Sequence, residues 1–120
     1  MIRGLKFVSI PVKDQEKSLK FYTEKLGFQI LTDQAFDNQR WIELGIPGAE
    51  TGISLFTPPG HESRVGQFQG LSFWSDNVKK SYEKMSALGV EFVQAPKSES
   101  WGTSAIFKDI DGNQFVLGSR

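Results

Sequence analysis

The sequence predicts an α+β fold in which two βαβββ modules form a cupped mixed sheet with the helices on its outer face. An internal repeat is the main observation behind this prediction. The segment SLKFYTEKLGF, residues 18–28, has the pattern of an amphipathic helix that ends at a glycine before a strand, and KSYEKMSALGVEF, residues 80–92, repeats it. Gly27 and Gly89 stand 62 residues apart (89 − 27), about half of the 120-residue chain. One copy of about 60 residues buries little surface alone, so we expect the two copies to form a single domain over residues 1–120.

The first module covers residues 1–60. Its first strand, residues 5–12, is rich in apolar and β-branched side chains. Because proline has no N–H, Pro11 places the end of this strand at a sheet edge or leaves it unpaired there. Asp14 is predicted to cap the following helix, and Gly27 to end it in the left-handed conformation. Three further strands are expected at residues 28–36, 40–46 and 52–57.

The second module covers residues 68–120 and follows a polar loop rich in glycine and proline at residues 58–67. Its first strand is predicted at residues 68–74. Asp76 or Asn77 caps a helix that ends at Gly89. The remaining strands are expected at residues 90–94, 103–108 and 114–117, with DIDGN, residues 109–113, as the turn between the last two.

Composition excludes several classes of function. Fourteen basic residues balance fourteen acidic ones without a basic stripe, so we expect neither a nucleic-acid partner nor a membrane surface. The absence of cysteine excludes thiolate metal sites and cysteine nucleophiles. No apolar run approaches the ~18 residues of a membrane span, and the N-terminal apolar run is too short for a signal peptide. We therefore expect a cytoplasmic protein.

Several short motifs carry a resemblance to a known family. In the first half they are Val12-Lys13-Asp14, Ser18, Phe21-Tyr22 and Leu26-Gly27-Phe28; in the second half they are Asp76, Leu88-Gly89-Val90, Trp101-Gly102-Thr103 and the DIDGN turn. In this order they resemble the vicinal oxygen chelate superfamily, which includes glyoxalase I, extradiol dioxygenases, fosfomycin-resistance enzymes and bleomycin-resistance proteins. The resemblance implies paired βαβββ modules around one pocket, often across a dimer, so a homodimer is expected.

The resemblance also implies where a metal would bind. Enzymes of this superfamily hold a divalent metal with four His, Gln or Glu side chains from the first and last strands of each module. The corresponding positions here are Phe7, Leu55, Gly70 and Val116, and none of these can ligate a metal through its side chain. A shift of one residue offers only Gln69 as a donor. We therefore expect no metal and no cofactor. Whether the protein is an enzyme stays open, but the loss of the ligand positions favours a non-enzymatic role.

The leading hypothesis is a metal-free protein that binds a small apolar or aromatic molecule and sequesters a drug or a metabolite. Ligand pockets are mostly apolar, and hydrocarbon side chains at the former metal positions would line such a pocket. Trp101 is the first choice for stacking because it lies in the loop KSESWGTS, with Trp41 and Trp74 as alternatives. The predicted ligand-binding residues are Phe7, Ser9, Leu55, Gly70, Trp101 and Val116.

The alternative hypothesis is an enzyme. It could be a glyoxalase- or dioxygenase-like catalyst with displaced ligands such as Glu43, His61 and Gln69, or a metal-independent isomerase with Glu43 as its base. Glu43 alternates with Ile42 and Leu44 in a predicted strand, so its side chain is expected on the opposite face from theirs. A third possibility is a structural or regulatory module whose pocket is filled by its own side chains.

Overall fold

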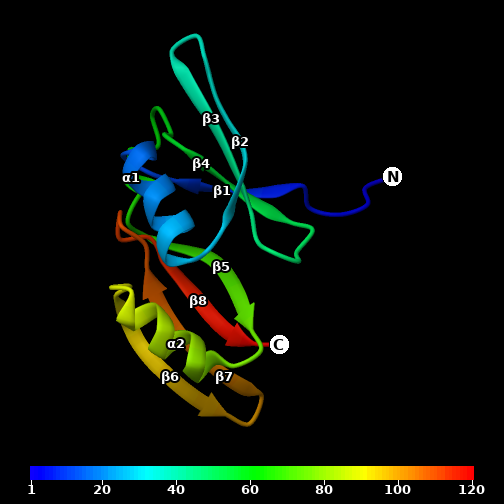
Figure 1. Ribbon diagram of the computed structural model, residues 1–120, viewed down its shortest axis with the longest axis vertical. Coiled ribbons are helices and arrows are strands. Elements are labelled where there is room, and N and C mark those ends of the chain that lie inside the picture. Colours follow the sequence, from blue (N-terminus) through cyan, green and yellow to red (C-terminus); the bar gives the residue numbers. More distant parts are fainter. The chain divides into compact units, whose positions relative to one another are not determined.

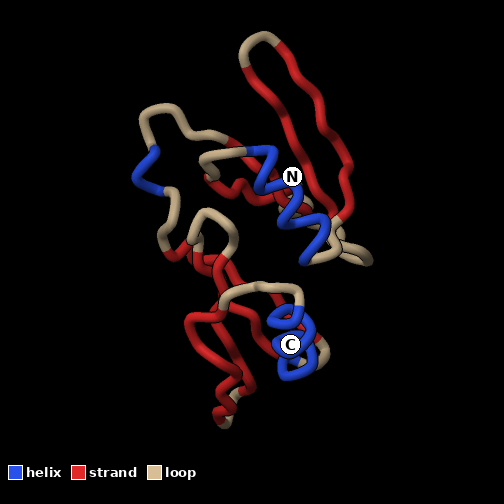
Figure 2. Tube along the Cα trace, turned by 60° about the vertical axis from the view of Figure 1, so that its left-hand side comes forward, coloured by secondary structure: helices blue, strands red, loops and turns tan.

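The order of elements follows the predicted repeat, since each half of the chain is βαβββ. The computed structural model describes the backbone of residues 1–120 and all side chains except that of Phe36. The chain divides into two units, which we call unit 1 (Met1–Arg64) and unit 2 (Val65–Arg120). The described strands form two four-stranded mixed sheets, one in each unit, where the sequence suggested a single sheet. Figure 2 shows helical segments and strands in both units.

Unit 1 contains the first sheet, with the strand order β1-β4-β3-β2. Strands β1 and β4 are parallel, and the other two pairs are antiparallel. Strand β1 is an edge strand, which confirms the interpretation of Pro11. The elements of this unit are β1 (Phe7–Pro11), α1 (Gln15–Lys20), η1 (Phe21–Lys25), β2 (Gln29–Phe36), β3 (Gln39–Gly45), β4 (Gly52–Phe56) and η2 (Glu62–Arg64) (Figure 1).

The first helix begins where the sequence predicted but does not stay regular. The Asp14 side chain accepts a hydrogen bond from the Lys17 backbone N–H at 3.1 Å, so Asp14 is the N-cap. After Lys20 the helix widens into the π-helical turn η1. Within this turn, the Thr23 hydroxyl donates to the Leu19 carbonyl oxygen at 2.7 Å and competes for the backbone acceptor.

The core of unit 1 lies between this helix and one face of the sheet. Ile42 pairs with Leu55, and Leu44 pairs with Ile53, so the four side chains point to the same side. We call this side the helix-covered face. Its core residues are Ile10, Val12, Leu19, Phe21, Tyr22, Ile42, Leu44, Ile53 and Leu55, all of which are buried.

Unit 2 contains the second sheet, with the strand order β5-β8-β7-β6 and one parallel pair, β5 with β8. Asn77 caps its helix by accepting from the Lys80 backbone N–H at 3.0 Å. Strand β6 runs past the predicted end and through Pro96, which an edge strand tolerates. The elements are β5 (Phe68–Ser75), α2 (Val78–Ala87), β6 (Phe92–Glu99), β7 (Gly102–Lys108) and β8 (Gln114–Ser119) (Figure 1).

The predicted turn between β7 and β8 is held by a buried polar network. Asp109 accepts hydrogen bonds from the backbone N–H groups of Asp111 and Asn113 and from the Asn113 side-chain amide. The side-chain oxygen of Asn113, Oδ1, in turn accepts from the Gly66 backbone N–H at 2.8 Å and from the Gln69 amide at 2.9 Å. Because Asn113 is fully buried, water cannot replace these partners, and each polar group of the network depends on the others for its hydrogen bonds.

Candidate functional site

The first sheet has a second face, opposite the helix-covered one. Side chains alternate along each strand, and the pairing of β1 with β4 and of β3 with β4 fixes which residues share this side. We call it the aromatic face, after the rings of Phe7 and Trp41. Its central residues are Phe7, Ser9, Trp41, Glu43 and Ser54.

Two rings meet across this face. The ring centroids of Phe7 and Trp41 are 5.5 Å apart with an angle of 70° between the planes, an edge-to-face arrangement. Phe7 comes from β1 and Trp41 from β3, and β4 lies between those strands, so the contact passes over β4. Beneath it, β4 carries Gly52 beside Phe7, and Ser54, which is only 1% exposed. The two rings therefore form an aromatic platform over small residues.

Polar groups border this platform. The Trp41 indole N–H donates to Oε1 of Glu43 at 2.9 Å, and the Ser54 hydroxyl donates to the Ser9 hydroxyl oxygen at the same distance. Glu43 and Ser54 are direct cross-strand neighbours. The described residues give Oε2 of Glu43 no protein partner, and a carboxylate accepts about four hydrogen bonds in total. The half-buried Glu43 can therefore accept further donors.

Leu55 lies on the helix-covered face, although the sequence suggested it as a pocket residue. Its side chain is 1% exposed and pairs with Ile42, and its carbonyl oxygen accepts from the Gln15 amide at 2.9 Å. The corresponding place on the aromatic face belongs to Ser54, one residue earlier. Phe7 and Ser9 do lie together on the aromatic face, as their spacing of two residues predicts.

The remaining predicted residues lie in unit 2. Val116 pairs with Ser72 and Ile106 on the side of the second sheet opposite the buried Phe115 and Leu117. Gly70 has a positive φ of 66° where the pairing of β5 with β8 is irregular. Trp101 is 72% exposed in the turn between β6 and β7.

Two other tryptophans differ from Trp101 in their contacts. Trp74 is 55% exposed, and the Arg120 guanidinium lies 4.7 Å from the centre of its ring. Trp41 is half-buried and is fixed by both Phe7 and Glu43. The sequence favoured Trp101 for its loop, whereas Trp41 has the more constrained ring. Trp41 and Glu43 are two residues apart in one predicted strand, and this spacing indicates that their side chains lie on the same face.

The residues at the positions of the superfamily's metal ligands do not fit a metal site. Phe7, Gly70 and Val116 have no donor atoms in their side chains, and Ser54 binds Ser9. Gln69 uses its amide N–H groups on the Gln67 carbonyl oxygen and on Asn113. Across the part of the chain whose side chains are described, no group of three or more His, Asp or Glu residues could hold a metal ion.

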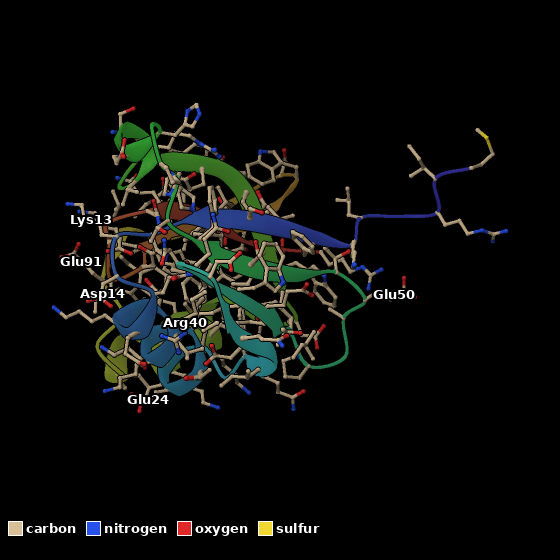
Figure 3. The ribbon with its side chains drawn as sticks, turned by 90° about the horizontal axis from the view of Figure 1, so that it is seen from above. Lys13, Asp14, Glu24, Arg40, Glu50 and Glu91 are labelled. Atoms are coloured by element: carbon tan, nitrogen blue, oxygen red, sulfur yellow. The ribbon has the colours of Figure 1, made fainter. Side chains whose placement is uncertain are left out.

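The strongest ion pair of unit 1 lies on the helix-covered face. Arg40 donates from Nε and Nη2 to the two carboxylate oxygens of Asp33, both at 2.8 Å, and from Nη1 to Glu16 at 3.3 Å. These bonds lower the pKa of Asp33 and raise that of Arg40. Figure 3 labels Arg40 beside the first helix, near Asp14. Arg40 thus joins α1 to the β2–β3 hairpin and is already occupied by carboxylates.

Comparison with known proteins places the chain in a family. The model of the Glyoxalase/Bleomycin resistance protein/Dioxygenase superfamily matches residues 4–117. The chain belongs to this superfamily. The match confirms the resemblance drawn from the short motifs, and it spans both units.

Relatives in this superfamily cover nearly the whole chain. The uncharacterized protein YetH of Bacillus subtilis is 36% identical over 118 residues, 98% of each chain. The crystal structure of a superfamily member from Sphaerobacter thermophilus is similar with a TM-score of 0.90 and 33% identity, covering 99% of this chain and 98% of that one. TnmS3, an antibiotic binding protein from Streptomyces sp. CB03234, has a TM-score of 0.86 and 33% identity, covering 98% and 96%. Among the described residues, no helix is long and apolar enough to cross a membrane.

Proposed function

We propose that this protein is a metal-free small-molecule-binding member of the superfamily that sequesters a flat apolar or aromatic drug or metabolite. One observation carries the proposal. The first strand of unit 1, from which related enzymes supply a metal ligand, instead contributes Phe7 to an edge-to-face pair with Trp41. Hydrocarbon and aromatic surfaces at this position favour stacking over coordination.

The physical driving force is burial of the ligand's apolar surface against the platform. Such burial contributes about 25 cal/mol per Å² before the costs of association, and a favourable aromatic pair adds about 0.5–1.5 kcal/mol. The similarity to TnmS3, an antibiotic binding protein, supports the binding of a small molecule. Phe7, Trp41 and Ser9 are the proposed contacts in unit 1, whereas Leu55 is left out because it is buried under the helix. Gly70, Val116 and Trp101 in unit 2 stay predictions, as do a homodimer and a cytoplasmic location.

Ligand binding is tested with acridone, a neutral three-ring probe, by quenching of tryptophan fluorescence and by thermal unfolding. We expect saturable quenching and a raised Tm. Phe7→Leu keeps an apolar side chain but removes the ring, and should weaken binding about 2- to 12-fold, the equivalent of ~0.5–1.5 kcal/mol. Trp101→Phe tests the second predicted stacking residue separately. Absence of binding by acridone and by charged three-ring probes would refute the proposal.

The metal-free state is tested by elemental analysis of protein purified without chelators. We expect less than about 0.1 equivalent of any transition metal, since the donor set is poor. Stoichiometric zinc, nickel, iron or manganese would contradict this part of the proposal. The ligand-binding part would then be judged by repeating the acridone titration after EDTA treatment.

A second candidate function is a metal-independent isomerase or epimerase. The position of Glu43 favours it, because this carboxylate lies on the aromatic face with Oε2 available to take a proton. Glu43→Gln keeps the size of the side chain and removes the base. An activity that survives this change and EDTA would count against both Glu43 as a base and displaced metal ligands such as His61 and Gln69.

A further inference from the structure

We infer that the ligand of the aromatic face is a planar aromatic cation whose charge is recognised by Glu43. This inference rests on the proposed binding function and adds the chemical class of the ligand. Glu43 is the one ionisable residue among the five central residues of the face, the others being aromatic or hydroxylic. A platform with a single carboxylate at its border favours a flat molecule with positive charge at its edge.

The hydrogen bond from Trp41 holds the carboxylate in place. One oxygen of Glu43 accepts the indole N–H at 2.9 Å, and the other has no partner among the described residues. Because Glu43 is half-buried, its charge is less screened than that of a fully exposed residue. An N–H group on a cationic ring would form a charge-assisted hydrogen bond with Oε2, about twice as strong as a neutral one.

The aromatic rings act in the same direction as the carboxylate. The face of an indole or phenyl ring attracts cations because its quadrupole is negative there, and tryptophan is the best of the aromatic residues in this role. Donation from the Trp41 N–H to an anionic acceptor polarises the indole and increases electron density on the ring. Trp41 and Glu43 therefore both favour a positively charged ligand.

Charged groups of unit 1 other than Glu43 lie on both sides of the sheet, and one of them, Arg64, lies over a ring of the aromatic face. The Arg40, Asp33 and Glu16 cluster belongs to the helix-covered face. The Arg64 guanidinium lies 5.7 Å from the ring centre of Phe56, which is two residues beyond Ser54 on β4. Arg64 would favour an anionic ligand at that end of the strand, so an anionic probe is needed to weigh the two charges.

Three probes of similar shape separate these possibilities: 9-aminoacridine, a cation at pH 7; acridone, which is neutral; and anthracene-9-carboxylate, an anion. We expect the full-length protein to bind 9-aminoacridine about tenfold more tightly than acridone, and the anion most weakly. Glu43→Gln should weaken 9-aminoacridine binding about tenfold and leave acridone within about twofold.

Glu50→Gln is the matched control, because it removes the same charge from an exposed loop before β4 (Figure 3). This control should change none of the three affinities. If Glu43→Gln does not fold, the unmodified protein still gives a test: raising the salt from about 20 to 500 mM should weaken 9-aminoacridine binding severalfold and leave acridone binding unchanged.

The outcomes distinguish this inference from the proposed function. If acridone binds but 9-aminoacridine binds no more tightly, or if Glu43→Gln affects the two probes equally, the inference is wrong and the binding function stands. Tightest binding of the anion would also overturn it, in favour of Arg64. If none of the probes binds, both the inference and the proposed function fall.

Discussion

Replacing Leu55 by alanine tests which side of the first sheet faces a ligand. Leu55 is 1% exposed and packs beside Ile42 on the helix-covered face. The substitution removes three carbon atoms, which corresponds to about 2.4 kcal/mol at ~0.8 kcal/mol per buried carbon, and the residual cavity adds to this. We expect a loss of roughly 3–4 kcal/mol from the free energy of unfolding, a large part of the ~5–15 kcal/mol typical of a protein.

Urea unfolding followed by circular dichroism measures this loss, and acridone titration of the folded variant measures binding. We expect the midpoint of unfolding to fall strongly while the affinity for acridone stays within about twofold. Phe7→Ala is the paired variant on the aromatic face, where the half-buried ring should contribute less to stability, about 1–2 kcal/mol, and more to binding. A Leu55→Ala protein that loses less than about 1 kcal/mol of stability and also loses acridone binding would refute the assignment of the two faces.

Three further predictions concern stability. Asn113→Ala should lower the free energy of unfolding by about 2–4 kcal/mol, because buried donors lose their acceptor, and hydrogen exchange should show a less protected turn. Asp33→Asn should cost about 0.5–1 kcal/mol at pH 7 in urea titrations. Because Arg40 lowers the folded pKa of Asp33, this contribution is complete above the unfolded value of about 3.9 and is lost as the pH falls through the lowered folded value; a difference that did not shrink as the pH fell below about 3.9 would contradict the ion-pair explanation. Gly52→Ala should lower Tm, since a Cβ there would clash with the Leu44 carbonyl oxygen, and an unchanged Tm would show that the strand can shift without cost.

Much of the fold could be predicted from local signals. The position of Asp14 before an apolar stripe predicts a helix cap, which its side chain provides. Gly27 and Gly89 are predicted helix ends, and both have positive φ, at 75° and 93°. The turn-forming residues of DIDGN predict the turn between β7 and β8. These features depend on a few adjacent residues, so a single sequence contains the information needed to find them.

Features that depend on pairing between distant strands were harder to predict. The face on which Leu55 lies is set by its register with Ile42, thirteen residues earlier, and an error of one position moves a side chain to the other face. The sequence predicts that this strand ends at Gln94, yet β6 continues through Pro96 to Glu99, which is possible because β6 is an edge strand. The π turn after Lys20 likewise has no clear sequence signal, since the residues there favour an ordinary helix.

The bond between the Trp41 indole and Glu43 has a consequence for the thermodynamics of recognition. It restrains the torsions of both side chains before any guest arrives, so complex formation has less rotamer entropy to remove, an effect of roughly 0.5–1.5 kcal/mol for each immobilised side chain. A preorganised surface of this kind should bind its ligand with little rearrangement of the protein.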